Sequence, residues 1–242
     1  MVYSIRPIAL CEGIRDMSLW TYRWNIGTKV KSANYIWYVE GSNPKILVDA
    51  GAQGEHYNPE FPMTTRISLD EGLAKVGLAP EDIGIVIITH MHFDHMALSN
   101  RYQNATFVVQ RKELDFARNP HVFSAVDYNP NYFEGIKLQV VDGDTEIIPG
   151  VRVLLTPGHS PGGQSVQIDT EDGKAIITGF CSQMSTFTQT PLMKERGLEV
   201  AACGLHTDCR EAYDSVLRVK READIIIPCH DPMFMDVERI PR

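Results

Sequence analysis

A run of three histidines and one aspartate, HMHFDH at residues 90–95, is the feature that most constrains this chain. It follows the apolar run IVII, from which Thr89 alone separates it, and such a run is typical of a buried strand. Imidazole and carboxylate groups are ligands suited to zinc, iron or manganese. His90 and His92, at alternate positions, can converge on one cation and leave Asp94 and His95 for a second one beside it. A solvated polar loop or a purification-tag remnant is the alternative, but the run is internal and interleaved with apolar residues.

Two further histidines follow strand-like segments. His159 comes after VLLTPG and before SPGG, and His230 comes after IIIPC and before DP. Each stands where a strand gives way to a turn, so both can meet the first cluster at one edge of a sheet. A lone histidine in such a place is ordinarily a turn residue. Together with the cluster, the two are predicted to be further metal ligands.

Composition and charge disfavour several classes of protein. Hydrophobic residues make up 43% and charged residues 22% of the chain, which is ordinary globular usage. The net charge of −8, from 23 basic and 31 acidic residues, disfavours nucleic acid as a partner. No run approaches about 18 apolar residues, so no membrane span is predicted. The sequence begins without a secretory signal and its five cysteines include no CxxC pair, so we expect reduced thiols in a cytoplasmic protein.

Short apolar, β-branched runs bounded by turn residues recur along the chain and predict strands. They lie at 35–39, 46–48, 83–89, 106–110, 138–141, 151–156, 164–168, 175–178 and 225–228. Helix-like spacing of apolar residues predicts helices over 65–76 and 208–221, the second opened by Asp208 and Glu211 as a capping pair. Strands and helices follow one another without a linker-like break, which indicates a single layered α/β domain spanning 1–242.

Two stretches are predicted to be long loops. Residues 119–135 hold four aromatic side chains among asparagines and prolines, and residues 182–204 hold methionines, a phenylalanine and leucines. Long ordered loops in compact domains are often lids or binding loops, and these two are candidates for an apolar pocket around a substrate. A loop packed against the body of the protein, or a dimer contact, is the alternative.

The motifs resemble those of the metallo-β-lactamase superfamily, in which an HxHxDH run precedes two single histidines. The segment LVDAG at 47–51 is similar to the superfamily's strand that ends in an aspartate, which implies that Asp49 supports the metal ligands from behind. Order and spacing fit from about residue 30 to the end of the sequence. Within the superfamily, the HxHFDH form, the TPGHSPGG stretch and the late PCHD most resemble the N-acyl homoserine lactonases.

This resemblance implies a fold, a cofactor and a set of ligands. The fold is an α/β (α+β) four-layer αββα sandwich, with the metals in a groove at one edge between two mixed sheets. The cofactor is Zn²⁺, one or two ions per chain, with iron or manganese as alternatives. A homodimer is a further expectation from the family. The implied metal ligands are His90, His92, Asp94, His95, His159 and His230.

One segment departs from the family pattern. The family's strand ending in Thr-Gly-Asp supplies an aspartate that bridges two metals, whereas this chain has TGFCS and places Phe180 at that position. The lactonases also carry a tyrosine three residues further on, where this chain has Gln183. Cys181 is a candidate replacement ligand if a bulge shifts the register, because adjacent strand residues face opposite ways. The alternative is that Cys181 is a small buried hydrophobe.

Three interpretations of this departure stay open. The protein holds two metals without a protein bridge, or it holds one metal tightly at His90, His92 and His159, or it is a binding protein with reduced chemistry. Activity is favoured, because a chain without chemistry has no physical reason to keep such a polar cluster. We therefore expect a metal-dependent hydrolase of a small-molecule lactone or carboxylic ester, resembling the quorum-quenching lactonases. A thioesterase or cyclic-amide hydrolase is one alternative, and a metal-dependent ligand-binding or regulatory protein without turnover is another.

The expected mechanism uses water activated by the metal. A bound cation lowers the pKa of water from 15.7 to about 7, and a cation also polarises the carbonyl that is attacked. Asp94 is the predicted catalytic residue, because it can ligate the metal and orient the water or pass its proton. The nucleophile motif GxSxG is absent from the sequence. His56 and His121 are expected at the surface, and His206 is either a surface residue or a candidate to replace a lost ligand.

Overall fold

Two β-sheets form the centre of the protein in the computed structural model, which describes residues 1–241. The first sheet is 7-stranded, with the spatial order β4-β1-β2-β3-β5-β6-β7. Its strands are β1 (Ser4–Asp16), β2 (Lys29–Glu40), β3 (Lys45–Val48), β4 (Thr64–Thr65), β5 (Ile83–Ile87), β6 (Thr106–Gln110) and β7 (Lys137–Val141). Strands β1, β2 and β3 pair antiparallel, whereas β3, β5, β6 and β7 run parallel, so the sheet is mixed.

The second sheet is 5-stranded, with the spatial order β12-β11-β10-β9-β8. Its strands are β8 (Thr145–Ile148), β9 (Val151–Leu155), β10 (Gln164–Thr170), β11 (Gly173–Ile177) and β12 (Ile225–Ile227). Because β10 is antiparallel to both β9 and β11, and β12 is parallel to β11, the strands β9, β11 and β12 end at the same edge.

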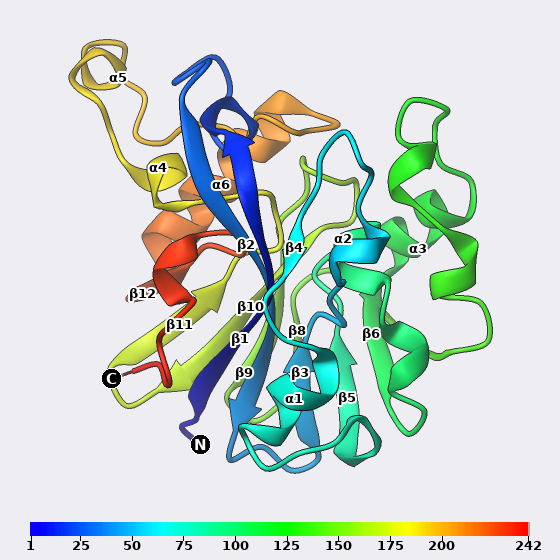
Figure 1. Cartoon of the computed structure of the whole chain (residues 1–242). Helices are drawn as coiled ribbons and strands as arrows, with labels where there is room; N and C mark the ends of the chain where they lie inside the picture. The colour runs from blue at the N-terminus through cyan, green and yellow to red at the C-terminus, as the bar shows by residue number, and fades with distance from the viewer. Residues whose placement is uncertain (242) are drawn as a thin grey trace.

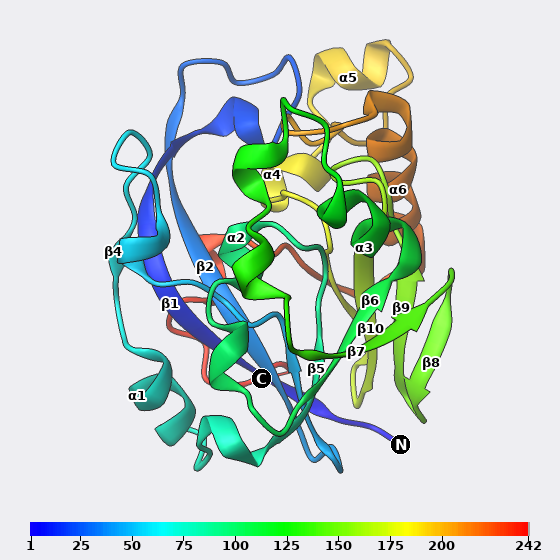
Figure 2. The same ribbon diagram turned by 90° about the vertical axis from the view of Figure 1, so that its right-hand side faces the viewer.

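Helices cover the outer faces of the two sheets. They are α1 (Leu69–Ala74), α2 (Phe93–Met96), α3 (Arg111–Arg118), α4 (Met184–Phe187), α5 (Pro191–Glu195) and α6 (Cys209–Glu222). In Figure 1 the orange α6 lies at the upper left of the molecule and the green α3 at the right. Figure 2 shows the same layers from the side, with both termini at the lower end.

Three apolar cores fill the spaces between these layers. Because side chains alternate along a strand, neighbouring residues of one strand contribute to different cores. Ile36 and Tyr38 of β2 face the core that also holds Leu69, Leu73 and Leu114 of the helices. Tyr35, Trp37 and Val39 face the core between the sheets. On the far side of the second sheet, Leu154 and Ile176 pack with Ala212, Val216 and Val219 of α6. Burial on both faces of both sheets is what a four-layer sandwich requires.

The edge at which the parallel strands end is where the two sheets are joined. Gln164, the first residue of β10, donates its side-chain amide to the carbonyls of Ile88 (2.7 Å) and Val108 (3.2 Å). Its backbone N–H donates to the carbonyl of Thr89 at 2.8 Å. These bonds hold the segment after β5 against the start of β10, and the predicted site lies in this region.

The four-layer αββα fold predicted from the sequence is confirmed, and each predicted strand overlaps an observed one. The helix predicted over 208–221 is α6, whose N-cap Asp208 accepts hydrogen bonds from the N–H groups of Arg210 and Glu211. The helix predicted over 65–76 is shorter: Ser68 and Glu71 form a capping box that starts α1 at Leu69, and Thr64 and Thr65 pair with β1 instead. None of the helices in the described residues combines the length and apolar character needed to cross a membrane.

Candidate metal centre

The candidate site begins where β3 and β5 end side by side. Asp49 follows β3 and has a left-handed φ of 63°, a conformation that Asp tolerates better than most residues. Its carboxylate accepts hydrogen bonds from the backbone N–H (2.8 Å) and the hydroxyl (3.0 Å) of Thr89. These bonds fix the start of the segment that carries the histidine run. His92 then caps α2, so that Asp94 and His95 lie in its single turn.

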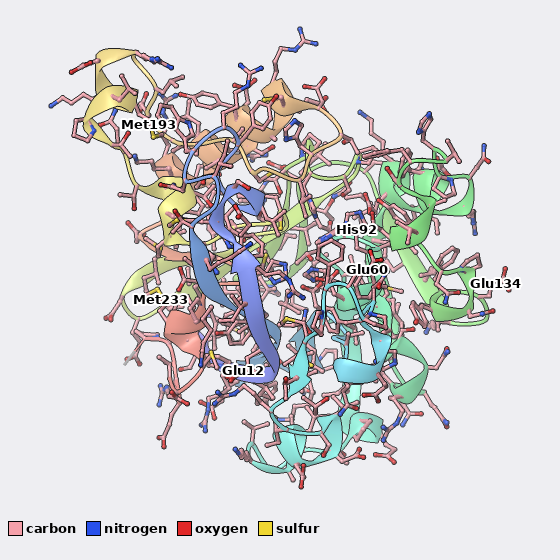
Figure 3. All side chains as sticks on the ribbon, turned by 45° about the horizontal axis from the view of Figure 1, so that its top comes forward. Glu12, Glu60, His92, Glu134, Met193 and Met233 are labelled. Carbon is pink, nitrogen blue, oxygen red and sulfur yellow. The ribbon has the colours of Figure 1, made fainter. Side chains whose placement is uncertain are left out.

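The side chains of His90, His92 and His159 converge. One nitrogen from each lies within 4.8 Å of the others, and the Nε2 atoms of His90 and His159 are 3.1 Å apart. His159 reaches this point from the second sheet, four residues after the end of β9. In Figure 3 the labelled His92 lies between the blue β1–β2 hairpin and the green segment that carries α3.

A second group lies beside the first. His90, Asp94 and His95 also bring donor atoms within 4.8 Å of one another. The Oδ2 atom of Asp94 is 3.4 Å from Nε2 of His95 and 3.7 Å from Nε2 of His230, which follows β12. The six residues that the sequence placed at one sheet edge are thus brought together from both sheets.

The outward-facing nitrogens of three rings donate to oxygen atoms. Nδ1 of His95 lies 2.7 Å from Oδ2 of Asp49, Nδ1 of His159 lies 2.7 Å from the carbonyl of Leu205, and Nδ1 of His230 lies 3.0 Å from the carbonyl of Ala33. A neutral ring that donates through Nδ1 presents the lone pair of Nε2 to the interior of the site. Within residues 1–241, the buried Nε2 of His95 has no hydrogen-bond partner. This donor set therefore fits a divalent cation.

Burial and charge set the protonation states of these groups in the metal-free chain. Burial, reinforced by the neighbouring histidines, holds the pKa of His90 well below its usual value. Burial likewise lowers the pKa of His159 to about 4. For Asp94, burial raises the pKa, but His95 and His230 outweigh burial and hold the pKa below its usual range. At neutral pH the neutral imidazoles of His90 and His159 therefore lie beside the ionised Asp94, and these are the states that bind metals. The charges of Asp94 and Asp49 instead raise the pKa of His95, so that this ring must lose a proton before it can act as a ligand.

Phe180 and Cys181 do not join these groups. Phe180 is 0% exposed and packs in the core on the outer side of the second sheet, with its ring centroid 6.3 Å from that of Phe187. Cys181 belongs to the same core, and burial raises the pKa of its thiol well above the usual value. Among the described residues, the two groups of converging donors leave Cys181 out. The environment of Cys181 is that of a small buried hydrophobic residue.

Gln183, at the position of the family's tyrosine, is buried and fully engaged. Its amide nitrogen donates to the carbonyls of Lys31 (2.8 Å) and His230 (3.2 Å). The side chain therefore holds the backbone of His230 against β2. A side chain tied in this way has no amide proton left to offer to a substrate.

His206 and the two segments predicted as long loops lie in different surroundings. The half-buried His206 is 2.8 Å from the carbonyl of Cys203 through Nδ1 and packs edge-on against Tyr22. In the first long loop, the ring of Tyr128 meets the ring of His92 at 4.9 Å between centroids. The second predicted loop is wrong in part, because it contains α4 and α5, and Phe187 of α4 is buried against Phe180. The two loops thus reach different parts of the molecule.

One buried acid beside the site, Glu113, was not predicted from the sequence. Glu113, 1% exposed, accepts a hydrogen bond from the backbone N–H of Met91, between His90 and His92. In the sequence it follows Arg111 and Lys112 at the start of a helix, where a charged residue ordinarily faces solvent. Its partners are two backbone N–H groups and the hydroxyl of Tyr128, all distant in the sequence, so the sequence held no local signal for its burial.

Comparison with known proteins gives a consistent result. The sequence model of a family described as "Metallo-beta-lactamase superfamily" matches residues 31–230. An N-acyl homoserine lactonase from a Bacillus species is 32% identical over 158 residues, which cover 60% of this chain and 62% of that protein. The chain thus matches less than two thirds of the length of such curated relatives.

Solved structures are similar over nearly the whole chain. A quorum-quenching N-acyl homoserine lactone lactonase superposes with a TM-score of 0.76 at 28% identity, covering 96% of this chain and 94% of that one. An N-acyl homoserine lactone hydrolase, with the product N-hexanoyl-L-homoserine bound at its catalytic metal center, has a TM-score of 0.73 at 26% identity, with the same coverage.

Proposed function

Because the chain belongs to the metallo-beta-lactamase superfamily, we propose that it is a metal-dependent hydrolase that opens a lactone or cleaves another small carboxylic ester. The convergence of His90, His92 and His159, with Asp94, His95 and His230 beside them, carries the proposal. The likeness to proteins named N-acyl homoserine lactonases supports a lactone as the substrate.

We propose that these six residues hold one or two divalent cations per chain, zinc in the first place. A divalent cation bound there lowers the pKa of water towards neutrality and polarises the carbonyl under attack. The low pKa values of His90 and His159 support this assignment, because neutral imidazole is the form that ligates. Asp49 supports His95 through the bond to Nδ1, as carboxylates behind metal-binding histidines commonly do.

Asp94 is the proposed acid–base group. In lactone hydrolysis, water adds to the carbonyl carbon, the ring carbon–oxygen bond breaks, and the ring oxygen gains a proton to become the hydroxyl of a hydroxy acid. Asp94 is ionised at neutral pH and retains 18% exposure of its side chain, so it can accept a proton from water. Returning that proton to the leaving oxygen completes the reaction without net consumption of acid.

A thioester is the second candidate substrate, and Gln183 is the observation that favours it over a cyclic amide. The family's tyrosine hydroxyl is replaced by an amide whose protons are bonded to the carbonyls of Lys31 and His230. A substrate that relied on that tyrosine would lose one contact here. A thioester, whose thiolate leaves more easily than an alkoxide, depends less on that contact, whereas a cyclic amide, with its poorer leaving group, depends on it more.

Metal content is the first test. Elemental analysis of protein purified without added metal is expected to give about one or two divalent ions per chain, with fewer in Asp94→Ala. Two ions in the parent and one in Asp94→Ala indicate a dinuclear site. Loss of an ion in Cys181→Ala would make the thiol a ligand after all. A parent chain that binds no divalent ion, even when zinc is supplied, contradicts the proposal.

Turnover is the second test. The metal-loaded protein is assayed with N-hexanoyl homoserine lactone, an aryl ester, an acyl thioester and a six-membered cyclic amide. We expect the lactone to be hydrolysed fastest, and Asp94→Asn to lower kcat by about 100-fold or more. Asp142→Asn, an exposed aspartate paired with Arg111, is the matched control and should leave kcat unchanged. Retained metal with no hydrolysis of any of the four compounds would identify a binding protein instead.

A further inference from the structure

Glu113 is a buried carboxylate that binds three separate parts of the chain. It lies in the first turn of α3 and is 1% exposed. Its Oε1 accepts hydrogen bonds from the backbone N–H of Met91 (2.9 Å) and from the hydroxyl of Tyr128 (3.2 Å). Its Oε2 accepts one from the backbone N–H of Gly162 (3.0 Å). No Lys or Arg of the described chain forms an ion pair with it.

Two of these bonds bind the loops that carry the first histidine group. Met91 stands between His90 and His92 in the loop after β5, and Gly162 stands three residues after His159 in the loop after β9. One carboxylate therefore joins a loop of the first sheet to a loop of the second. Both loops must keep a fixed separation for the nitrogens of His90 and His159 to face each other at 3.1 Å.

The backbone of Gly162 packs closely against the backbone of Glu113. A Cβ atom at Gly162 would lie 2.1 Å from the backbone nitrogen of Glu113, far inside any permitted contact. The loop after His159 thus presses directly on the start of α3, and only glycine allows the approach. The carboxylate of Glu113 reaches past this contact to the N–H of the same glycine.

The third bond extends to a ring of the site. Tyr128 donates its hydroxyl to Glu113, and its ring packs edge-on against the ring of His92, with an interplanar angle of 79°. On another side, the Tyr128 ring meets Phe116 at 5.5 Å. With its hydroxyl held and its ring packed, Tyr128 limits the orientations open to the His92 imidazole.

We infer that Glu113 is a positioning residue that holds His90, His92 and His159 in the arrangement that binds the first cation. It acts through Met91, Gly162 and Tyr128 and touches no reacting atom. The inference rests on the proposed metal site, because it assigns these bonds a purpose in ligation. Carboxylates that support metal ligands from behind typically change metal affinity by about 10- to 100-fold when they are removed.

The test uses Glu113→Gln in the full chain with zinc as the probe. The amide keeps the size of the side chain, but its NH₂ group cannot accept a hydrogen bond. At least one of the donors that now bond to the Glu113 carboxylate therefore loses its acceptor. We expect the dissociation constant for the tightest zinc ion, measured by competition with a chromophoric chelator, to rise about 10- to 100-fold. Glu222→Gln, which removes a helix carboxylate paired with the surface residue Arg218, is the matched control and should leave it unchanged.

Thermal unfolding separates positioning from a purely structural role. If Glu113 positions the ligands, the rise in Tm on adding zinc is smaller in Glu113→Gln than in the parent. If Glu113→Gln lowers the Tm of the metal-free and zinc-loaded forms equally, with the zinc dissociation constant unchanged, the inference is wrong.

Tyr128→Phe is a second, milder variant. It removes one hydrogen-bond donor from Glu113 and keeps the ring against His92. If Glu113→Gln does not fold, this variant tests whether Glu113 positions the zinc ligands. We expect it to weaken zinc binding by several-fold, and an unchanged dissociation constant in this variant would overturn the inference. A parent chain that binds no zinc is a different result, because it contradicts the proposed function itself.

Discussion

Oδ2 of Asp49 lies 2.7 Å from Nδ1 of His95, and both side chains are almost wholly buried. The bond turns Nε2 of His95 towards Asp94 and His230. Burial lowers the pKa of His95, but the charges of Asp94 and Asp49 outweigh burial and raise the pKa well above its usual value in the metal-free chain. A cation bound at Nε2 would therefore have to displace a proton, and Asp49 would keep the ring aligned through its bond to Nδ1.

Asp49→Asn should weaken metal binding at the group that contains His95. Asn tolerates the left-handed backbone at this position, so the variant tests the carboxylate and not the fold. We expect the affinity for the more weakly bound ion to fall about 10- to 100-fold, measured by titration with zinc under chelator competition. Asp70→Asn, which removes an exposed carboxylate paired with Arg101, serves as the control. Equal affinities in parent and Asp49→Asn would refute the role.

Phe180→Asp should destabilise the protein without adding a metal ligand. The side chain of Phe180 lies in the apolar core with Trp20 and Phe187, where a carboxylate would be desolvated and unpaired. We expect a loss of about 3–5 kcal/mol in the free energy of unfolding, measured with urea, and no gain in bound metal. Phe180→Leu, which keeps an apolar side chain, should lose less. A stable Phe180→Asp chain with tighter metal binding would show that this position does face the metals.

Gly158→Ala should damage both the fold and the site. Gly158 precedes His159, has a φ of +116°, and leaves only 2.1 Å between an added Cβ and the backbone nitrogen of Ala212 in α6. We expect a loss of roughly 2 kcal/mol or more in unfolding free energy, together with weaker zinc binding, because His159 must shift. Gly135→Ala has a similar positive φ but open space around the added Cβ, so it should cost about 1 kcal/mol and leave zinc binding intact.

Asp127 should make the stability of the metal-free protein depend on pH. Burial, with a smaller contribution from the charge of Asp94, raises the pKa of this partly buried carboxyl to about 6. The folded state therefore holds the proton more tightly than the unfolded state, whose pKa is about 3.9. The contribution of Asp127 to stability is complete below about pH 4 and is lost as the pH rises towards 6.

Asp127→Asn removes this dependence. The gain in unfolding free energy of the variant over the parent should grow by about 1–2 kcal/mol between pH 4 and pH 7, measured with urea on metal-free protein. A difference that stays constant across this range would mean that the carboxyl of Asp127 titrates in the folded state as it does in water.

The elements that could be predicted are those whose pattern of apolar residues, turn residues or caps lies within the element itself. The strand β6 has a continuous apolar, β-branched run, and its predicted bounds match the structure. The helix α6 has both its apolar spacing and its cap at Asp208. By contrast, β1 was not predicted, because Pro7 and Gly13 and alternating charges interrupt its pattern; its pairing with β2 compensates for its own weak preference.

The candidate site divides in the same way. The histidine run at 90–95, together with His159 and His230, could be predicted from the sequence, because several histidines that each follow a strand are a rare combination. Glu113 was not predicted, because glutamate is a common residue and its partners, the backbone N–H groups of Met91 and Gly162 and the hydroxyl of Tyr128, are brought to it only by the fold. The surroundings of Cys181 were also beyond prediction, since only the packed structure shows that its neighbours are apolar.

His90, His159 and His230 follow strands of both sheets and lie far apart in the sequence, yet they meet at one edge. A cation held by His90 and His159 would act as a reversible cross-link between the two sheets and close a long loop of chain. Opening the sandwich at this edge would then require the cross-link to break first. We therefore expect removal of metal to speed the separation of the two sheets and to expose their shared core to proteases, even where the folded shape is unchanged.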